Sequence, residues 1–159
     1  GGVDAFTCAV GTGGTLAGTS LYLKEQSANA KIVLADPMRS ALYNWVNTGE
    51  ATMTPGPSMT EGIGNSRVTQ NLAPAKIDDA VQVDDQMMVD MVYRLLHQEG
   101  WFFGSSSGIN LGAAVKIAKD LGPGHTIVTI LCDGGSKYQS RLYNPDFLAE
   151  RDLTIPRFA

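Results

Sequence analysis

Near the start of the chain, a run of apolar residues leads directly into a glycine-rich turn, and a helix-like stretch follows the turn. The apolar run spans residues 3–10, the turn is Gly-Thr-Gly-Gly-Thr at 11–15, and the helix-like stretch covers 16–26. A strand that feeds a glycine-rich turn at the start of a helix is typical of a phosphate site, because glycine leaves the backbone amides accessible and the helix dipole attracts an anion. The pattern therefore predicts a strand-turn-helix unit with a phosphate site, and the alternative is a connection that binds nothing.

Two common nucleotide-binding signatures are incomplete in this turn. The dinucleotide fingerprint requires a third glycine three residues after the second, and Leu16 occupies that position. The spacing from Gly13 to Gly18 imitates a nucleoside triphosphate loop, but Thr19 stands where that motif requires lysine. A nucleotide-binding domain is therefore an alternative that rests on the glycine turn alone.

The composition favours one compact globular domain, because 43% of the 159 residues are hydrophobic and 18% are charged. The net charge is -4 and the basic residues are dispersed, which predicts no nucleic-acid partner. No apolar run approaches the roughly 20 residues of a membrane span, so we expect a soluble, cytoplasmic protein without membrane contact. Cys8 and Cys132 both lie in apolar runs and are expected to be buried, and neither shares a metal-ligand spacing with His97 or His125, so no metal site is predicted.

Apolar strand-like segments alternate with helix-like segments along the chain. This alternation predicts an α/β fold, a three-layer αβα arrangement whose mainly parallel sheet is covered on both faces. Residues 49–65 are rich in Gly, Pro, Thr and Ser, and they are predicted to form a long mobile loop. The expected strands are 3–10, 31–35, 80–83 and 126–131, and the expected helices are 16–26, 40–46, 85–99, 105–121 and 138–147 with a break at Pro145.

Three turns rich in glycine or serine follow strand-like segments, at 11–15, 104–108 and 132–135. In open α/β sheets, ligands bind beyond the carboxyl ends of the strands. We therefore expect these turns to converge on one cleft. The helix that follows the serine-rich turn is expected to bury Ala114, Ile117, Ala118 and Leu121.

Four motifs occur together in a specific order: Gly-Thr-Gly-Gly-Thr-Leu-Ala-Gly at 11–18, Glu-Gly-Ile-Gly at 61–64, Gly-Ser-Ser-Ser-Gly at 104–108, and Tyr138. In order and interval they resemble the cysteine synthase family of pyridoxal-phosphate (PLP) enzymes, which includes cystathionine β-synthase. The resemblance covers nearly the whole chain and corresponds to the C-terminal half of such an enzyme. It implies that residues 1–159 form a single cofactor-binding fragment of the large domain of a fold-type II PLP enzyme, incomplete at its N-terminal side.

The resemblance also implies a cofactor site. The family's glycine-rich loop holds the phosphate of pyridoxal 5'-phosphate, one glycine lies beside the ring, and one serine meets the pyridine nitrogen. A neutral hydroxyl at that nitrogen does not keep the ring protonated, and the weaker electron sink suits elimination and replacement at the β-carbon of an amino acid. Ser106 is also consistent with a simple helix cap. The implied residues are Gly11, Thr12, Gly13, Gly14 and Thr15 for the phosphate, Gly62 beside the ring, and Ser106 at the nitrogen.

In such enzymes an activated serine loses its β-substituent and a sulfur nucleophile replaces it. The resemblance implies a homodimeric cysteine synthase that acts on the small amino acid O-acetylserine with sulfide. The family's Schiff-base lysine lies in an N-terminal segment that this sequence lacks, so we expect no catalytic residue here, an inactive chain by itself, and an N-terminal half as its partner. The alternatives are cystathionine β-synthase, a serine or threonine deaminase, and a non-catalytic fragment that acts as a binding or assembly partner.

Two departures from the family's commoner pattern concern the substrate side. Residues 65–68 read Asn-Ser-Arg-Val, and Cys132-Asp133 replaces a frequent Pro-Ser pair. Arg67 is expected either to face an anionic group of the substrate or to be a solvated loop arginine.

Overall fold

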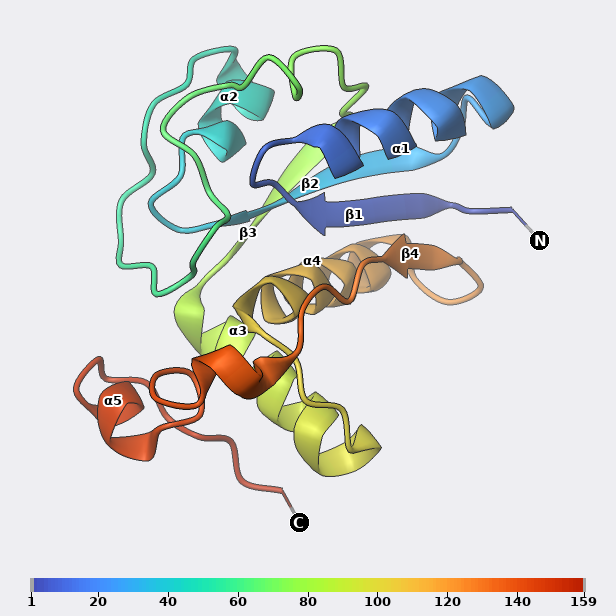
Figure 1. Cartoon of the computed structure of the whole chain (residues 1–159). Coiled ribbons are helices and arrows are strands. Elements are labelled where there is room, and N and C mark those ends of the chain that lie inside the picture. Colours follow the sequence, from blue (N-terminus) through green and yellow to red (C-terminus); the bar gives the residue numbers. More distant parts are fainter. Residues whose placement is uncertain (1, 159) are drawn as a thin grey trace.

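The computed structural model describes residues 2–158 and contains a four-stranded sheet with helices on both sides (Figure 1). Among these residues, no helix combines the length and apolar character needed to cross a bilayer. The elements in chain order are β1 (Ala5–Ala9), α1 (Gly14–Gln26), β2 (Lys31–Pro37), α2 (Leu42–Thr48), β3 (Asp79–Val83), α3 (Asp85–Arg94), the π-helical turn η1 (Leu95–Glu99), α4 (Ser105–Leu121), β4 (Ile127–Thr129), the 3-10 turn η2 (Gly135–Tyr138) and α5 (Pro145–Ala149).

The strands are ordered β3-β2-β1-β4, and every neighbouring pair is parallel. The connections from β1 lead outward on one side to β2 and β3, whereas α3 and α4 bring the chain back to place β4 on the other side of β1. The sheet therefore has a topological switch point between β1 and β4, and the segments that follow these two strands lie at the same edge. This is the place in an open parallel sheet where ligands bind.

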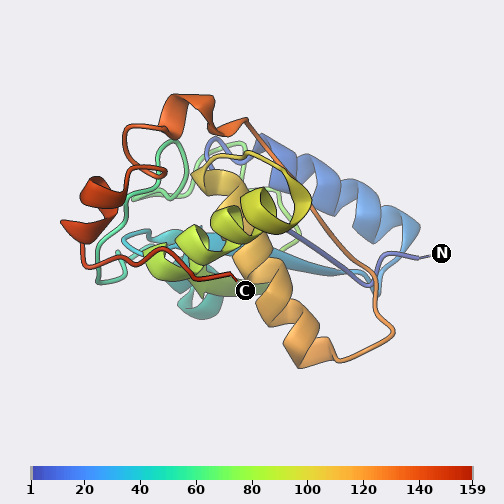
Figure 2. The same ribbon diagram turned by 90° about the horizontal axis from the view of Figure 1, so that it is seen from below.

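Alternating side chains of β1 and β2 pack on opposite faces of the sheet, as the period of a strand requires. Phe6 and Leu34 belong to a core that includes Leu16 of α1 and Leu42 of α2. Val33 packs in a second group with Ile117 of α4. Figures 1 and 2 show α1 and α2 on one face and α3 and α4 on the other. The predicted three-layer αβα fold with a parallel sheet is confirmed.

Several expectations about individual elements are wrong. Strand β4 has three residues rather than six and lies at the sheet edge, where Val128 is 38% exposed. Helix α4 leaves Ala118 exposed, because its buried face runs through Ile109, Ala113 and Ile117 instead. Residues 138–147 do not form one helix: Pro145 does not interrupt a helix but begins α5, a position that suits proline because it needs no amide donor.

A buried carboxylate lies near the carboxyl end of β2. The Asp36 side chain accepts a hydrogen bond from the Tyr43 amide at 2.8 Å, which ties β2 to α2. Burial raises the pKa of Asp36 to about 6, although hydrogen bonds from Ser40 and Tyr43 act in the opposite direction. The protonated form of Asp36 therefore stabilises the fold.

This raised pKa predicts a pH dependence of stability. The stabilisation that protonated Asp36 gives to the fold is complete below about pH 4, near the ordinary pKa of an aspartate. This stabilisation is lost as the pH rises through about 6. We expect this group alone to lower the free energy of unfolding of the chain by roughly 3 kcal/mol over that range. Urea denaturation of the wild type and of Asp36→Asn between pH 4 and 7 measures the difference, and the same pH slope in both proteins would contradict it.

Candidate functional site

The turn that follows β1, residues 11–15, presents unsatisfied amides at the start of α1; we call it the cradle. Gly13 is the N-cap of α1 with a φ of 93°, and no side chain caps the helix. No acidic residue occupies the first turn, and Thr12, Gly14 and Thr15 are exposed. Because the first amides of a helix lack intrahelical partners and the dipole there is positive, this geometry fits a phosphate.

The loop that carries Gly62 lies directly against the cradle. A β-carbon built on Gly11 would lie 2.5 Å from the carbonyl oxygen of Gly62, so the two backbones touch where only glycine fits. The Gly64 amide donates to the Val10 carbonyl at 3.0 Å, and the Asn65 side-chain amide donates to the Gly11 carbonyl at 2.6 Å. The structure thus brings together two motifs that are about fifty residues apart in the sequence.

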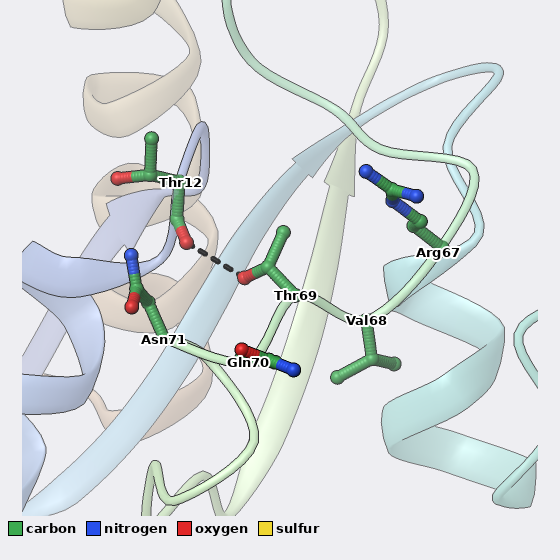
Figure 3. Close-up of a pocket in the computed structure, with 6 residues that line it drawn as sticks. All are labelled: Thr12, Arg67, Val68, Thr69, Gln70 and Asn71. Carbon is green, nitrogen blue, oxygen red and sulfur yellow. Dashed lines mark hydrogen bonds between the residues drawn. The ribbon is translucent and has the colours of Figure 1, made fainter.

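A pocket of about 470 Å³ adjoins the cradle on the side of residues 67–71 (Figure 3). The Thr69 hydroxyl donates to the Thr12 carbonyl at 2.6 Å and so fixes one wall of the pocket to the cradle. Arg67 is exposed and lines the same pocket as Thr12. The hypothesis that Arg67 faces an anionic group of the substrate stays a prediction, and the pocket supports it.

The three serines at the start of α4 have different environments. Gly104 is the N-cap and no side chain caps the helix, so the interpretation of Ser106 as a helix cap is wrong. The Ser107 hydroxyl accepts a hydrogen bond from the Cys132 amide at 2.9 Å, and the buried Ser105 hydroxyl has no partner among the described residues. Ser106 is 8% exposed, and its hydroxyl lies 3.4 Å from a carboxylate oxygen of Asp133.

Asp133 is the centre of a small polar cluster beside Ser106. The Tyr138 hydroxyl donates to Asp133 Oδ2 at 2.9 Å, and the Lys137 ammonium forms an ion pair with the same oxygen. Partial burial raises the pKa of Asp133, but the hydrogen bonds from Lys137 and Tyr138 outweigh burial and hold the pKa below its ordinary value. The carboxylate is therefore ionised at neutral pH.

Helix α4 is tied to the ends of both strands at the switch point through Asn110, which is 1% exposed. The side-chain oxygen of Asn110 accepts a hydrogen bond from the Ala9 backbone amide at 2.6 Å. Its side-chain amide donates a hydrogen bond to the Ile130 backbone carbonyl at 2.7 Å. Asn110 and Ser106 are four residues apart, so they share one face of the helix. The first turn of α4 therefore lies at the same edge of the sheet as the cradle, although no hydrogen bond joins Ser106 directly to the cradle within residues 2–158.

Several residues of this site were not predicted from the sequence. Asn65 and Thr69 hold the cradle, and Asn110 joins α4 to β1. For Asn110 a signal existed, because a polar residue stands one helical turn after Ser106, next to the apolar Ile109, Ala113 and Ile117, and a buried polar side chain needs hydrogen-bond partners. Cys132 was predicted to be buried but is exposed, because the chain leaves the sheet after the short β4, three residues before this position.

Comparison with known proteins gives the family. Residues 1–133 match the family described as pyridoxal-phosphate dependent enzyme. The chain belongs to this family. It is similar to cysteine synthase 1 of Neurospora crassa, with 45% identity over 157 residues that cover 96% of this chain and 42% of the relative. Cysteine synthase of Dictyostelium discoideum is 43% identical over 164 residues, which cover 98% of this chain and 43% of that protein.

Solved structures agree with the predicted fold-type II architecture. The O-acetylserine dependent cystathionine β-synthase from Helicobacter pylori superposes with a TM-score of 0.75 at 32% identity, covering 87% of this chain and 43% of the other. An O-ureido-L-serine synthase gives a TM-score of 0.76 at 30% identity, covering 89% of this chain and 43% of the other. The chain thus spans less than half the length of the relatives that it matches. The predicted resemblance to the cysteine synthase family is confirmed, and pyridoxal phosphate is the cofactor on which this family depends.

Proposed function

We propose that the full-length protein containing this chain is a PLP-dependent cysteine synthase, which replaces the acetate of O-acetylserine by sulfide to give cysteine. The observation that carries the proposal is the start of α1 at the cradle, which has no side-chain cap and no acidic residue in its first turn. The backbone of Gly62 packs directly against this cradle. The cysteine synthases that match nearly the whole chain support the choice of reaction. When bound, PLP supplies an electron sink that allows substitution at the β-carbon of an amino acid.

Each residue predicted from the sequence has a place in this proposal. The amides of Gly11, Gly13 and Gly14, together with the hydroxyls of Thr12 and Thr15, hold the cofactor phosphate at the positive end of α1. Gly62 leaves room for the edge of the ring, because its exposed backbone carries no side chain. Ser106, at the start of α4, contacts the pyridine nitrogen. These residues would bind and orient the cofactor.

The proposal requires a Schiff-base lysine from outside this chain, in the N-terminal half of the protein. Residues 1–159 then act as a single cofactor-binding fragment, inactive when alone, with the N-terminal half as its partner and residues 49–65 as a mobile loop. A homodimer in the cytoplasm is the further expectation from the family resemblance. The alternative of a non-catalytic assembly partner makes the opposite prediction, because restoring the N-terminal half would then not produce activity.

A direct experiment tests the reaction. The full-length protein, purified with PLP, is expected to show Schiff-base absorbance and to release cysteine from O-acetylserine only when sulfide is present, whereas the 159-residue chain should show neither. Absorbance is followed by spectrophotometry and cysteine by a colorimetric assay. Absence of both signals from the full-length protein would refute the assignment, and ammonia release without sulfide would favour a deaminase.

Cystathionine formation is a second candidate, because the Helicobacter pylori structure that matches this chain is an O-acetylserine dependent cystathionine β-synthase. The two reactions share the amino-acid substrate and differ in the sulfur nucleophile. Competition between homocysteine and sulfide at equal concentration separates them. A greater rate with homocysteine would assign the protein to cystathionine synthesis.

A further inference from the structure

The loop that carries Gly62 is fixed on both sides of that glycine. After the glycine, the Gly64 amide donates to the Val10 carbonyl at 3.0 Å. Before it, the Met59 amide donates to both carboxylate oxygens of Asp85, at 3.1 and 2.9 Å. Gly62 therefore lies between one anchor just beyond β1 and a second anchor at the start of α3, where Asp85 is the first residue.

Asp85 is a buried carboxylate that does not cap its own helix. The N-cap of α3 is Asp84, whose side chain accepts from the Met87 amide at 2.8 Å. Asp85 is 7% exposed, and within residues 2–158 its side-chain hydrogen bonds both come from the Met59 amide. Burial raises the pKa of Asp85 and the Met59 hydrogen bond lowers it, so this bond stabilises the charged form. Because a buried charge is costly without a partner, the loop and the carboxylate hold each other in place.

A cavity of about 380 Å³ adjoins this anchor, and Met59, Glu61, Asp85 and Arg141 are among its lining residues. Glu61 and Arg141 form an ion pair, but their side chains are 54% and 57% exposed, and an exposed ion pair contributes little to stability. The loop therefore has unfilled space beside residues 57–61. The buried hydrogen bond to Asp85 is the stronger of the two contacts that keep the loop from moving into this space.

We propose that Asp85 is a positioning residue for the cofactor site, which holds the loop so that Gly62 stays in contact with the cradle. The inference rests on the proposed function, in which Gly62 lies beside the ring of the cofactor. Met59 is three residues before Gly62, so a shift of the Met59 backbone reaches the glycine through a short segment. Asp85 thus acts on the site through the loop, and the contact of Gly62 with Gly11 is the point that it controls.

A double-mutant cycle in the full-length protein tests the inference, with the PLP affinity of the apoprotein measured by fluorescence titration. Asp85→Ala is expected to lower the PLP affinity by about 5- to 10-fold, because the Met59 amide loses its acceptor. Gly11→Ala displaces the same loop from the cradle side, since its β-carbon would lie 2.5 Å from the Gly62 carbonyl oxygen. Once one substitution has moved the loop, the second has less to change. The loss in the double variant is therefore expected to be smaller than the product of the single losses by about threefold or more.

Asp84→Ala is the matched control, because Asp84 is the adjacent residue and supports the same helix but bonds Met87 instead of the loop. It is expected to lower the free energy of unfolding, to leave PLP affinity within about twofold of the wild type, and to combine multiplicatively with Gly11→Ala. Asp85→Asn keeps one side-chain oxygen for the Met59 amide. Its PLP affinity is expected to return to within about twofold of the wild type.

Single losses that multiply in the variant carrying both Asp85→Ala and Gly11→Ala would overturn the inference alone, as would an affinity of Asp85→Asn as low as that of Asp85→Ala. Hydrogen exchange in the wild type is a second measurement, which does not depend on the folding of a variant. Bound PLP is expected to slow exchange of the Met59 amide, because coupling between two sites is reciprocal, and an unchanged rate would contradict the inference. Failure of the wild type to bind PLP at all would refute the proposed function, and this inference with it.

Discussion

Replacing Gly11 by alanine is expected to lower the PLP affinity of the full-length protein by about 10- to 100-fold. The added β-carbon would lie 2.5 Å from the Gly62 carbonyl oxygen, and backbone on both sides leaves no flexible side chain to yield. Overpacking of this kind costs about 1–3 kcal/mol, and about 1.4 kcal/mol corresponds to a factor of ten in affinity. The loop that carries Gly62 must therefore move away from the cradle. Fluorescence titration of the apoprotein with PLP measures the loss.

The control for this prediction is Gly18→Ala in α1. A β-carbon at Gly18 meets nothing within 4 Å, and the residue is exposed in the interior of the helix. Alanine there should leave PLP affinity unchanged and stabilise the helix by about 0.5–1 kcal/mol. Equal PLP affinities for Gly11→Ala and Gly18→Ala would show that the contact between the cradle and Gly62 does not shape the cofactor site.

The parts of the fold that local sequence determines were predictable. The apolar run before the cradle, the glycines and the helix that follows give β1, the turn and α1, because each feature acts over a few neighbouring residues. The start of the helix expected at 85–99 was predictable for the same reason, since the Asp84 side chain accepts from the Met87 amide three residues later. The alternation of such units was sufficient to predict a parallel sheet.

The rest depends on contacts between distant segments, which no local pattern encodes. The backbone contact between Gly11 and Gly62 depends on the path by which the loop after α2 returns to the end of β1. The exposure of Cys132 depends on where β4 ends. The buried face of α4 was misplaced because small residues at Ala114 and Ala118 gave the same pattern as a core stripe. A polar residue on that face, Asn110, forms hydrogen bonds with the chain at the ends of both β1 and β4.

These long-range contacts explain how the motifs proposed to hold the cofactor come to lie at one edge of the sheet. The cradle follows β1, Gly62 follows α2, and Ser106 lies in the first turn of α4. Hydrogen bonds from Gly64, Asn110 and Ser107 fix the last two segments to the residues at and just beyond the strand ends at one edge of the sheet. The side chains that make these bonds pair half-buried backbone groups, which would otherwise lack a partner within the protein. Since such groups cost about 1–3 kcal/mol each when left unsatisfied, the residues that pair them are expected to matter for stability as well as for the site.

Asn110→Ala is therefore expected to lower the free energy of unfolding of the chain by roughly 3–5 kcal/mol. It removes the acceptor of the Ala9 amide and the donor to the Ile130 carbonyl, and alanine leaves both half-buried backbone groups without these partners. In the full-length protein the start of α4 loses its connection to β1, so PLP affinity should fall as well. Urea denaturation and PLP titration measure the two effects.

Asn47→Ala provides the comparison, because the Asn47 side chain also donates to a backbone carbonyl, that of Tyr43 at 2.9 Å, but does so in an exposed position on α2. Water replaces that bond, so the expected loss is below about 0.5 kcal/mol. A loss for Asn110→Ala no greater than that for Asn47→Ala would mean that the first turn of α4 is held at the sheet edge by apolar packing alone. In that case Ser106 would keep its position without the polar link, and its alignment with the cradle would depend on the cores around Ile109 and Ile117 instead.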